Sequence, residues 1–242
     1  MISTWLWIGA IGMTAGLVAM VALGTTVAPE RRHHVVTSSF IVAIAACAYF
    51  AMANGQGTVD VGGRTVYYAR YLDWVLTTPL LLLGLITVAL PRLRSAEQSR
   101  ERNGIVGTVL GADVLMILTG LIATLTAKDA LKWSWYAISC VAFVVVLVAI
   151  VLPVRAAARE RGADYASLYD RLLGVLAALW FTYPIVWAIG TEGTKVVDLK
   201  VEVAIFAIID LLAKVGFGLL LITGAARLGT SAKQATTTPR TA

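Results

Sequence analysis

The chain has 242 residues, of which 59% are hydrophobic and only 14% are charged, and its mean hydropathy is +0.81. A soluble domain carries roughly a quarter of its residues as charged side chains, so this composition excludes soluble, disordered, collagen-like and disulfide-scaffold proteins. The formal net charge of +6 comes from Lys and Arg that gather between the apolar runs. It therefore gives no reason to expect a nucleic-acid partner.

Seven apolar runs are long enough to cross a membrane. A hydrocarbon core of about 30 Å needs roughly 20 apolar helical residues, and a helix satisfies its own backbone hydrogen bonds in lipid. In chain order the runs are 1–29, 34–59, 68–91, 104–127, 133–154, 172–191 and 203–226. The sequence predicts an all-α protein, with a seven-helix membrane domain over residues 1–228 and a disordered cytoplasmic tail over 229–242.

The positions of Lys and Arg predict the orientation of the bundle, because cytoplasmic connections are enriched in both. The connections after the first, third and fifth runs, together with the tail, hold thirteen of the 20 Lys and Arg residues. The other connections hold five. We therefore expect a multi-pass protein of the cell membrane, surrounded by lipid, with its N-terminus outside and its C-terminus in the cytoplasm.

Five ionisable side chains lie inside these runs: Arg70, Asp73, Asp113, Asp210 and Lys214. Intramembrane charges are costly and usually functional. Asp210 and Lys214 are four residues apart, and Arg70 and Asp73 are three apart, so each pair shares a helix face. Simple ion pairs that neutralise one another are the alternative.

Aromatic residues accompany these charges. Trp180, Tyr183 and Trp187 share one face of the sixth predicted helix, and Trp74 follows Asp73. Near the centre of a bilayer, such rings indicate a flat apolar ligand held between them, although plain core packing is the commoner use of an aromatic stripe. A buried amine can form a Schiff base with a carbonyl compound, and carboxylates would balance the resulting cation.

Three segments carry a resemblance to a known family. Residues 70–81, RYLDWVLTTPLL, resemble the third helix of microbial (type 1) rhodopsins, and residues 180–193 resemble their sixth helix. Residues 210–218, DLLAKVGFG, resemble their retinal-lysine motif. The resemblance covers nearly the whole chain and is strongest to the bacteriorhodopsin-like and archaeal sensory-rhodopsin-like branch. It implies that Lys214 carries all-trans retinal as a protonated Schiff base.

The same resemblance implies roles for other residues. Asp73 would be the primary counter-ion and proton acceptor, and Asp210 the second counter-ion. Thr77 would hydrogen-bond Asp73, and Arg70 would hold Asp73 ionised. The retinal pocket would include Tyr49, Trp74, Thr78, Leu81, Met116, Gly120, Tyr136, Ser139, Cys140, Phe143, Trp180, Tyr183, Pro184, Trp187 and Ala213.

Three further acids have expected roles. Glu192 and Glu202 match the paired glutamates of the family's extracellular proton-release group, in which two nearby carboxylates share a proton. Two solvated loop acids are the alternative. Asp113 matches a structural carboxylic acid that is protonated and hydrogen-bonded between helices. Cys47 and Cys140, in the middle of the second and fifth runs, are expected to be small apolar core residues.

Position 84 separates two possible functions. The bacteriorhodopsin pattern places a carboxylic proton donor eleven residues after the acceptor, about 16 Å along the same helix face, and here that residue is Gly84. Asp73, Thr77 and Gly84 form an Asp-Thr-Gly triplet associated with a bacterial sub-group of outward light-driven proton pumps. Archaeal sensory rhodopsins, which signal through a membrane transducer, also lack the donor.

We favour an outward light-driven proton pump that lacks the usual carboxylic donor, which is a transporter and not an enzyme, over a photosensor. Asp73 is ionisable, and Glu192 and Glu202 are both retained. Ala213 and Ile208 occupy positions where one sensory class carries Thr and Tyr. A transducer partner is expected only for a sensor, and a homo-oligomer, commonly a trimer in this family, is expected for either.

The route of proton uptake stays open. His34 is a speculative donor, because imidazole exchanges protons near neutral pH. Water passing Gly84, or Glu30, are alternatives. His33 and His34 are more readily interpreted as interfacial residues in a basic cap.

Overall fold

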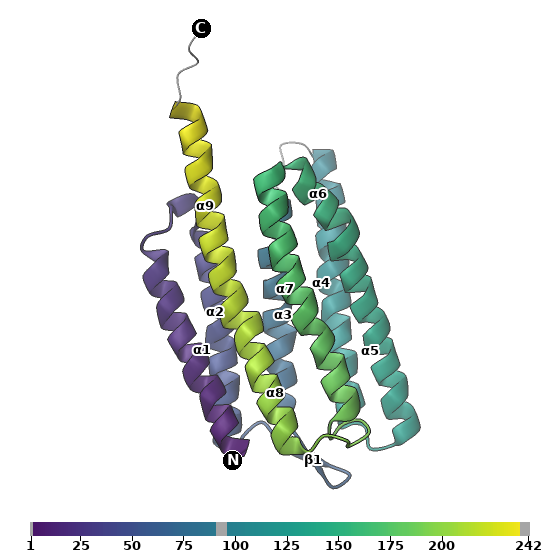
Figure 1. The fold of residues 1–242 in the computed structure, drawn as a ribbon. Coiled ribbons are helices and arrows are strands. Elements are labelled where there is room, and N and C mark those ends of the chain that lie inside the picture. The colour runs from purple at the N-terminus through teal and green to yellow at the C-terminus, as the bar shows by residue number, and fades with distance from the viewer. Residues whose placement is uncertain (1, 91–95, 238–242) are drawn as a thin grey trace.

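Long helices run side by side through the whole molecule (Figure 1), and the computed structural model describes residues 2–90 and 96–237. Within these residues, seven helical spans are long and apolar enough to cross a membrane, which confirms the predicted seven-helix bundle. The elements are α1 (Ile2–Gly24), η1 (Pro29–Arg31), α2 (Arg32–Ala53), β1 (Val59–Val61), β2 (Arg64–Val66), α3 (Tyr68–Ala89), α4 (Ala96–Leu125), α5 (Asp129–Ala149), η2 (Ile150–Val154), α6 (Arg155–Glu160), α7 (Ala163–Ile189), α8 (Leu199–Leu211), η3 (Leu212–Gly216) and α9 (Phe217–Thr237).

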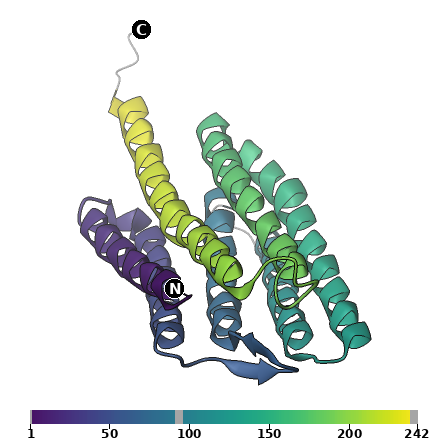
Figure 2. The same ribbon diagram turned by 60° about the horizontal axis from the view of Figure 1, so that its bottom comes forward.

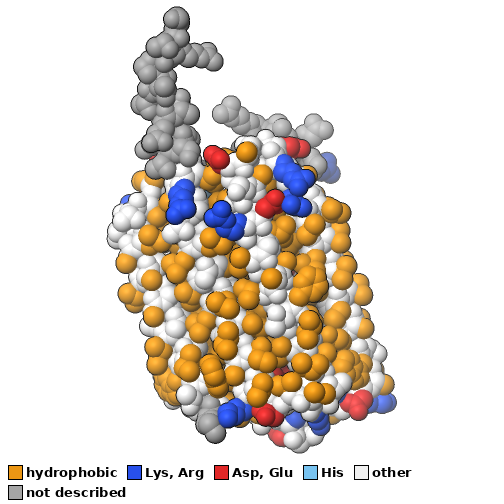
Figure 3. Space-filling view, in the orientation of Figure 1, with side chains coloured by type: hydrophobic (Ala, Val, Ile, Leu, Met, Phe, Trp, Pro, Cys, Tyr) orange, Lys and Arg blue, Asp and Glu red, His pale blue; other side chains and the backbone are white. Residues whose placement is uncertain are grey.

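The helices form a ring in which α3 and the last span face inward. Successive helices pack as neighbours from α1 to α5, and α8 closes the ring against α1. In the apolar stretch of α3, 61% of the residues are buried, and in that of the last span (Leu199–Leu228) 56% are buried. The fourth span (Arg102–Leu125) has only 28% of its apolar stretch buried. Apolar side chains cover the middle of the face shown in Figure 3, and charged side chains gather toward its two ends. The interior positions on α3, α8 and η3 are therefore the ones that can hold a buried site.

Within the described residues, two π-helical segments interrupt the helices, and neither was predicted from the sequence. In η2, Pro153 lacks the N–H group that a regular helix would use, and the hydroxyl of Tyr169 donates to the main-chain oxygen of Ile150 at 2.6 Å. The fifth span consequently continues through η2 and α6 to Glu160. The second segment, η3, contains Lys214.

A short antiparallel hairpin, also unexpected, joins α2 to α3. Val59 pairs with Val66, and Val61 pairs with Arg64. The turn residues Gly62 and Gly63 have φ of 61° and 78°, a left-handed conformation that two-residue hairpin turns require and glycine adopts readily. The hairpin lies at the end of the bundle that holds the N-terminus (Figure 2).

Several predicted boundaries change. Helix α7 begins at Ala163, before the apolar run at 172, and α9 continues to Thr237, past the expected end of the domain at 228. Charged residues end a membrane span but not a helix, and Ala, Lys and Gln favour helix continuation. Residues 238–242 of the expected disordered tail lie outside the described residues. Cys47 is exposed on α2 instead of lying in the core, so that part of the cysteine prediction is wrong.

Candidate functional site

Lys214 and two aspartates form a buried ionic cluster at the centre of the bundle. The Nζ atom of Lys214 lies 2.5 Å from Oδ2 of Asp73 and 3.1 Å from Oδ1 of Asp210. The three side chains are at most 1% exposed. Asp210 lies one turn before Lys214 on the last span, and α3 brings Asp73 to the amine from the other side. The sequence predicted these three residues as one site, and the structure brings them together.

The two carboxylates differ in how they are hydrogen-bonded. Asp210 accepts hydrogen bonds from the hydroxyls of Tyr49 and Tyr183, both at 2.7 Å, and from Nε1 of Trp74 at 3.2 Å, in addition to Lys214. By contrast, Oδ1 of Asp73 is buried with no hydrogen-bond partner among the described residues. Hydrogen bonds to a carboxylate favour its charged form. The carboxylate of Asp210 is therefore held by four donors, whereas Asp73 has one oxygen atom with an open position.

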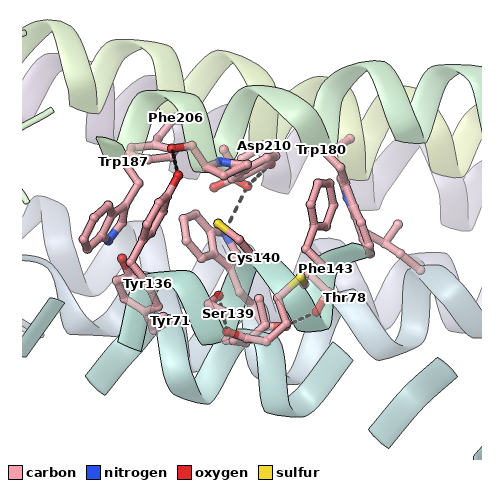
Figure 4. A pocket seen from close by; sticks show the side chains of 18 of the residues that line it. Tyr71, Thr78, Tyr136, Ser139, Cys140, Phe143, Trp180, Trp187, Phe206 and Asp210 are labelled. Carbon is pink, nitrogen blue, oxygen red and sulfur yellow. Dashed lines mark hydrogen bonds between the residues drawn. The ribbon is translucent and has the colours of Figure 1, made fainter. Parts of the chain in front are cut away.

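An elongated pocket extends from Lys214 between α3, α4, α5 and α7 (Figure 4). Every predicted lining residue except Tyr49 borders it. Tyr49 lies behind Asp210 and contributes its hydroxyl instead. The residues that also line the pocket but that we did not predict as lining are Tyr71, Ile117, Phe206, Asp210 and Lys214.

The wall of the pocket is aromatic and offers few free polar groups. The rings of Tyr136 and Trp187 stack at 4.4 Å with an interplanar angle of 10°. The hydroxyls of Tyr136 and Ser139 are already used, because they donate to the main-chain oxygens of Pro184 and Met116. A flat, apolar carbonyl compound held between rings and attached to the amine of Lys214 fits this lining.

Arg70 lies away from the aspartates and faces the end of the bundle that carries the hairpin. Its Nη1 atom lies 3.6 Å from Oε1 of Glu202, and its guanidinium lies 4.2 Å from the centre of the Phe206 ring. Among the described residues it forms no ion pair with Asp73, and its expected effect on the charge of Asp73 stays a prediction. The hydroxyl of Thr77 hydrogen-bonds Asp73 as expected: it donates to the main-chain oxygen at 2.9 Å and also interacts with the side chain.

Glu192 and Glu202 are buried together beside Arg70, being 3% and 0% exposed. The main-chain N–H and the hydroxyl of Thr191 donate to Oε2 of Glu202 at 2.7 and 2.8 Å. A Cβ on Gly190 would collide with that carboxylate, so the glycine permits its close approach. Burial, and then the charge of Glu202, raise the pKa of Glu192 to about 8, while Arg70 opposes the shift. The alternative of two solvated loop acids is wrong.

The opposite half of the bundle is apolar around Gly84. A Cβ added there would lie 3.0 Å from Cδ2 of Leu221, and Leu81, Leu85 and Phe217 belong to the same buried cluster. His34 is buried farther toward that end, and its Nδ1 atom has no hydrogen-bond partner among the described residues.

Asp113 joins two helices at the pocket. It is fully buried, and its Oδ2 atom accepts a hydrogen bond of 2.8 Å from the hydroxyl of Thr78, which links α4 to α3. The carboxyl thus occupies the interhelical position that the resemblance implied.

Comparison with known proteins agrees with this geometry. The family model described as bacteriorhodopsin-like protein matches residues 1–228. The chain belongs to the bacteriorhodopsin-like family. This family binds retinal through a Schiff base, and the rhodopsin described here is a multi-pass protein of the cell membrane.

Relatives cover almost the full length of this rhodopsin. It is 43% identical to a bacteriorhodopsin of Haloterrigena sp. (strain arg-4) over 91% of this chain and 86% of the relative. It is 39% identical to archaerhodopsin-3 of Halorubrum sodomense over 93% and 85%. The crystal structure of the thermophilic rhodopsin from Rubrobacter xylanophilus superposes with a TM-score of 0.88 at 43% identity, covering 93% of this chain and 96% of that one. A light-driven proton pump from Coccomyxa subellipsoidea gives a TM-score of 0.83 at 36% identity, covering 92% and 96%.

Proposed function

We propose that this rhodopsin is an outward light-driven proton pump. One observation carries the proposal: among the described residues, buried Arg and Glu side chains lie between the buried amine and the hairpin end of the bundle, whereas apolar side chains surround Gly84 in the other half. Lys214 contacts Asp73, and toward the hairpin end Arg70 pairs with Glu202, beside Glu192. The similarity to solved structures of light-driven proton pumps supports the same function.

The residues have separate tasks in this proposal. Lys214 would hold all-trans retinal as a protonated Schiff base, and light absorbed by that group supplies the change in proton affinity at the Lys214 nitrogen. Asp73 accepts the proton, because it is the carboxylate nearest to the amine and its Oδ1 atom has no hydrogen-bond partner among the described residues. Asp210 is the second counter-ion, and the hydroxyls of Tyr49 and Tyr183 hold it in place.

Proton release follows from the change of charge at Asp73. Once this carboxylate is neutral, it attracts Arg70 less, and the guanidinium interacts more strongly with Glu202. A nearby positive charge favours the ionised form of Glu192. The pair then gives up the proton that it shares.

Uptake proceeds without the usual carboxylic donor in this proposal. Apolar side chains pack around Gly84, and Leu221 lies beside the glycine. His34 is the speculative donor, since imidazole exchanges protons near neutral pH and its Nδ1 atom is unpartnered among the described residues. If His34→Ala leaves the rate of proton uptake unchanged at every pH, His34 is not the donor.

The direction of transport rests on the orientation of the bundle. We infer that the N-terminus and the hairpin face outward, because most of the Lys and Arg residues lie in the connections at the other end. The Glu192–Glu202 pair would then lie on the outer side. A protease site added at the N-terminus should be cut from outside intact cells.

Illumination of cells that express the protein with added retinal tests the pump directly. We expect light-driven acidification of the medium that a protonophore abolishes. Lys214→Ala is the matched control, because it removes the only amine in the pocket lining and should abolish both pigment and acidification. A wild-type pigment that causes no pH change, or responds only together with a transducer protein, would contradict the pump and favour a photosensor.

A further inference from the structure

Thr124 is a buried hydroxyl that joins three helices at the outer end of the pocket. Its Oγ1 atom accepts a hydrogen bond of 2.8 Å from Nε1 of Trp187 on α7. It shares a second, of 2.6 Å, with the hydroxyl of Tyr71 on α3. Trp187 and Tyr71 both line the pocket, on the side where Figure 4 shows Tyr136 and Phe206. Thr124 itself is fully buried at the end of α4.

The main chain of the same residue is held by Arg64 from the hairpin. The Nη2 atom of Arg64 donates to the main-chain oxygens of Thr124 at 2.5 Å and Thr126 at 3.1 Å. These carbonyls stand at the C-terminus of α4, where they lack helical partners and where a positive charge is favourable. The Nη1 atom of Arg64 donates to the main-chain oxygen of Glu192 at 2.9 Å. The guanidinium of Arg64 thus hydrogen-bonds both the C-terminal end of α4 and the loop that carries Glu192.

We propose that Thr124 and Arg64 are positioning residues that connect the aromatic end of the retinal pocket to the Glu192–Glu202 pair. The connection runs from Trp187 and Tyr71 through the threonine hydroxyl and main chain to the arginine, and then to the backbone of Glu192. It holds the carboxyl of Glu192 in its buried position, where Glu202, Arg70 and Tyr71 are the ionisable groups that interact with it. The inference rests on the proposed function only in treating this pair as the store of the released proton.

Isosteric variants test the connection in darkness, without transport. Thr124→Val removes the hydroxyl and keeps the shape, while Thr124→Ser restores the hydroxyl. Thr126→Val is the matched control, because its hydroxyl donates only to the exposed last turns of its own helix, at the oxygen of Ile122. The first measurement is the indole N–H resonance of Trp187, assigned with Trp187→Phe. We expect Thr124→Val to shift it, and Thr124→Ser and Thr126→Val to leave it near its wild-type position.

The second measurement is the infrared titration of the Glu192–Glu202 carboxyl band. Arg64→Gln should lower its midpoint by about one pH unit, because a released loop admits water to the pair and reduces the desolvation of Glu192. Thr124→Val should lower it in the same direction, and the double variant should change it by less than the sum of the two, as expected for groups in one network. Arg64→Lys, which keeps the charge but loses the forked geometry, should also lower the midpoint.

The possible results distinguish failure of the positioning role of Thr124 and Arg64 from failure of the proposed pump function. Midpoints that stay at the wild-type value in both Arg64→Gln and Thr124→Val overturn the positioning role, even if the indole resonance moves. A Thr126→Val variant that shifts the midpoint as far as Thr124→Val overturns it as well. Failure of the wild-type protein to acidify the medium contradicts the pump alone, because both measurements here are made without light. If Thr124→Val yields no folded protein, the two Arg64 variants decide.

Discussion

Replacing Glu192 with Gln tests whether the buried Glu192–Glu202 pair holds a proton at neutral pH. Burial and the neighbouring charge of Glu202 raise the pKa of Glu192 from 4.5 to about 8. A shift of this size corresponds to about 5 kcal/mol of preference for the neutral form, at about 1.4 kcal/mol per pH unit. Glu192 is therefore protonated in the folded protein at pH 7, whereas it is ionised in the unfolded chain.

The sign of the stability effect follows from this difference. The contribution of neutral Glu192 is fully present below pH 4.5 and is lost as pH rises toward 8, because the unfolded chain releases a proton that the folded protein retains. Glu192→Gln carries no such proton, so it should lose less stability than the wild-type protein across that interval. The difference between the two slopes, up to about 1.4 kcal/mol per pH unit, isolates this group from other acids.

Two assays measure the effect. Infrared titration in darkness should show a carboxyl band with a midpoint near pH 8 in the wild-type protein, and Glu192→Gln should lose that transition. Thermal unfolding of the pigment at several values between pH 5 and 8 should show the difference in slope. A wild-type midpoint near 4.5, or parallel loss of stability in both proteins, would refute the reasoning from burial.

Three other substitutions have expected outcomes. Asp73→Asn should abolish transport and shift the absorption maximum to longer wavelength, since it removes both the proton acceptor and the anion nearest to the amine. Photocurrents and absorption spectra measure the two effects, and an unshifted spectrum would argue against Asp73 as the counter-ion. Gly84→Asp should speed proton uptake by roughly tenfold or more above neutral pH, because it supplies a carboxylic donor. The side chain can be accommodated, since only the flexible tip of Leu221 lies close to the position. Flash photolysis with a pH dye measures the rate, and an unchanged rate would show that the new carboxyl does not act as a donor. Thr78→Val should cost about 1–3 kcal/mol by leaving a carboxyl oxygen of Asp113 unpaired. Thermal unfolding should show no such loss in an Asp113→Leu background, which has no polar group at that position to leave unpaired.

The spans and most of the pocket could be predicted because they depend on pattern. Hydropathy over about 20 residues reports lipid exposure directly, and a charge inside a span is rare enough to mark the site. The same helical spacing could have added two of the unpredicted lining residues. Tyr71 lies three residues before Trp74, and Phe206 lies four residues before Asp210, so each shares a face with a residue already assigned.

The partners of individual side chains could not be predicted in this way. Arg70 shares a helix face with Asp73 yet pairs with Glu202, because its side chain points toward the hairpin end of the bundle, where Glu202 lies. Thr124 is indistinguishable in sequence from Thr119, whose hydroxyl donates to the main-chain oxygen of Leu115 in the ordinary helical manner. The hydroxyl of Thr124 hydrogen-bonds residues of two other helices because the fold brings those helices next to it, whereas the hydroxyl of Thr119 does not.

The π-helical segment η3, which contains Lys214, determines how the last span would respond to the loss of a residue. A π turn holds one more residue than the α-helical turn that it replaces, and each residue of an α-helix advances about 100° around the axis. Because the wide turn takes up that extra residue, deletion of one residue between 212 and 216 would restore a regular helix and leave α9 facing nearly as it does now. Phe217, which is 1% exposed, would keep its packing partners, whereas a deletion in the regular α-helical part of this span would turn every later residue by about 100°. We infer that η3 is a part of the last span that can lose one residue without turning α9 away from the core.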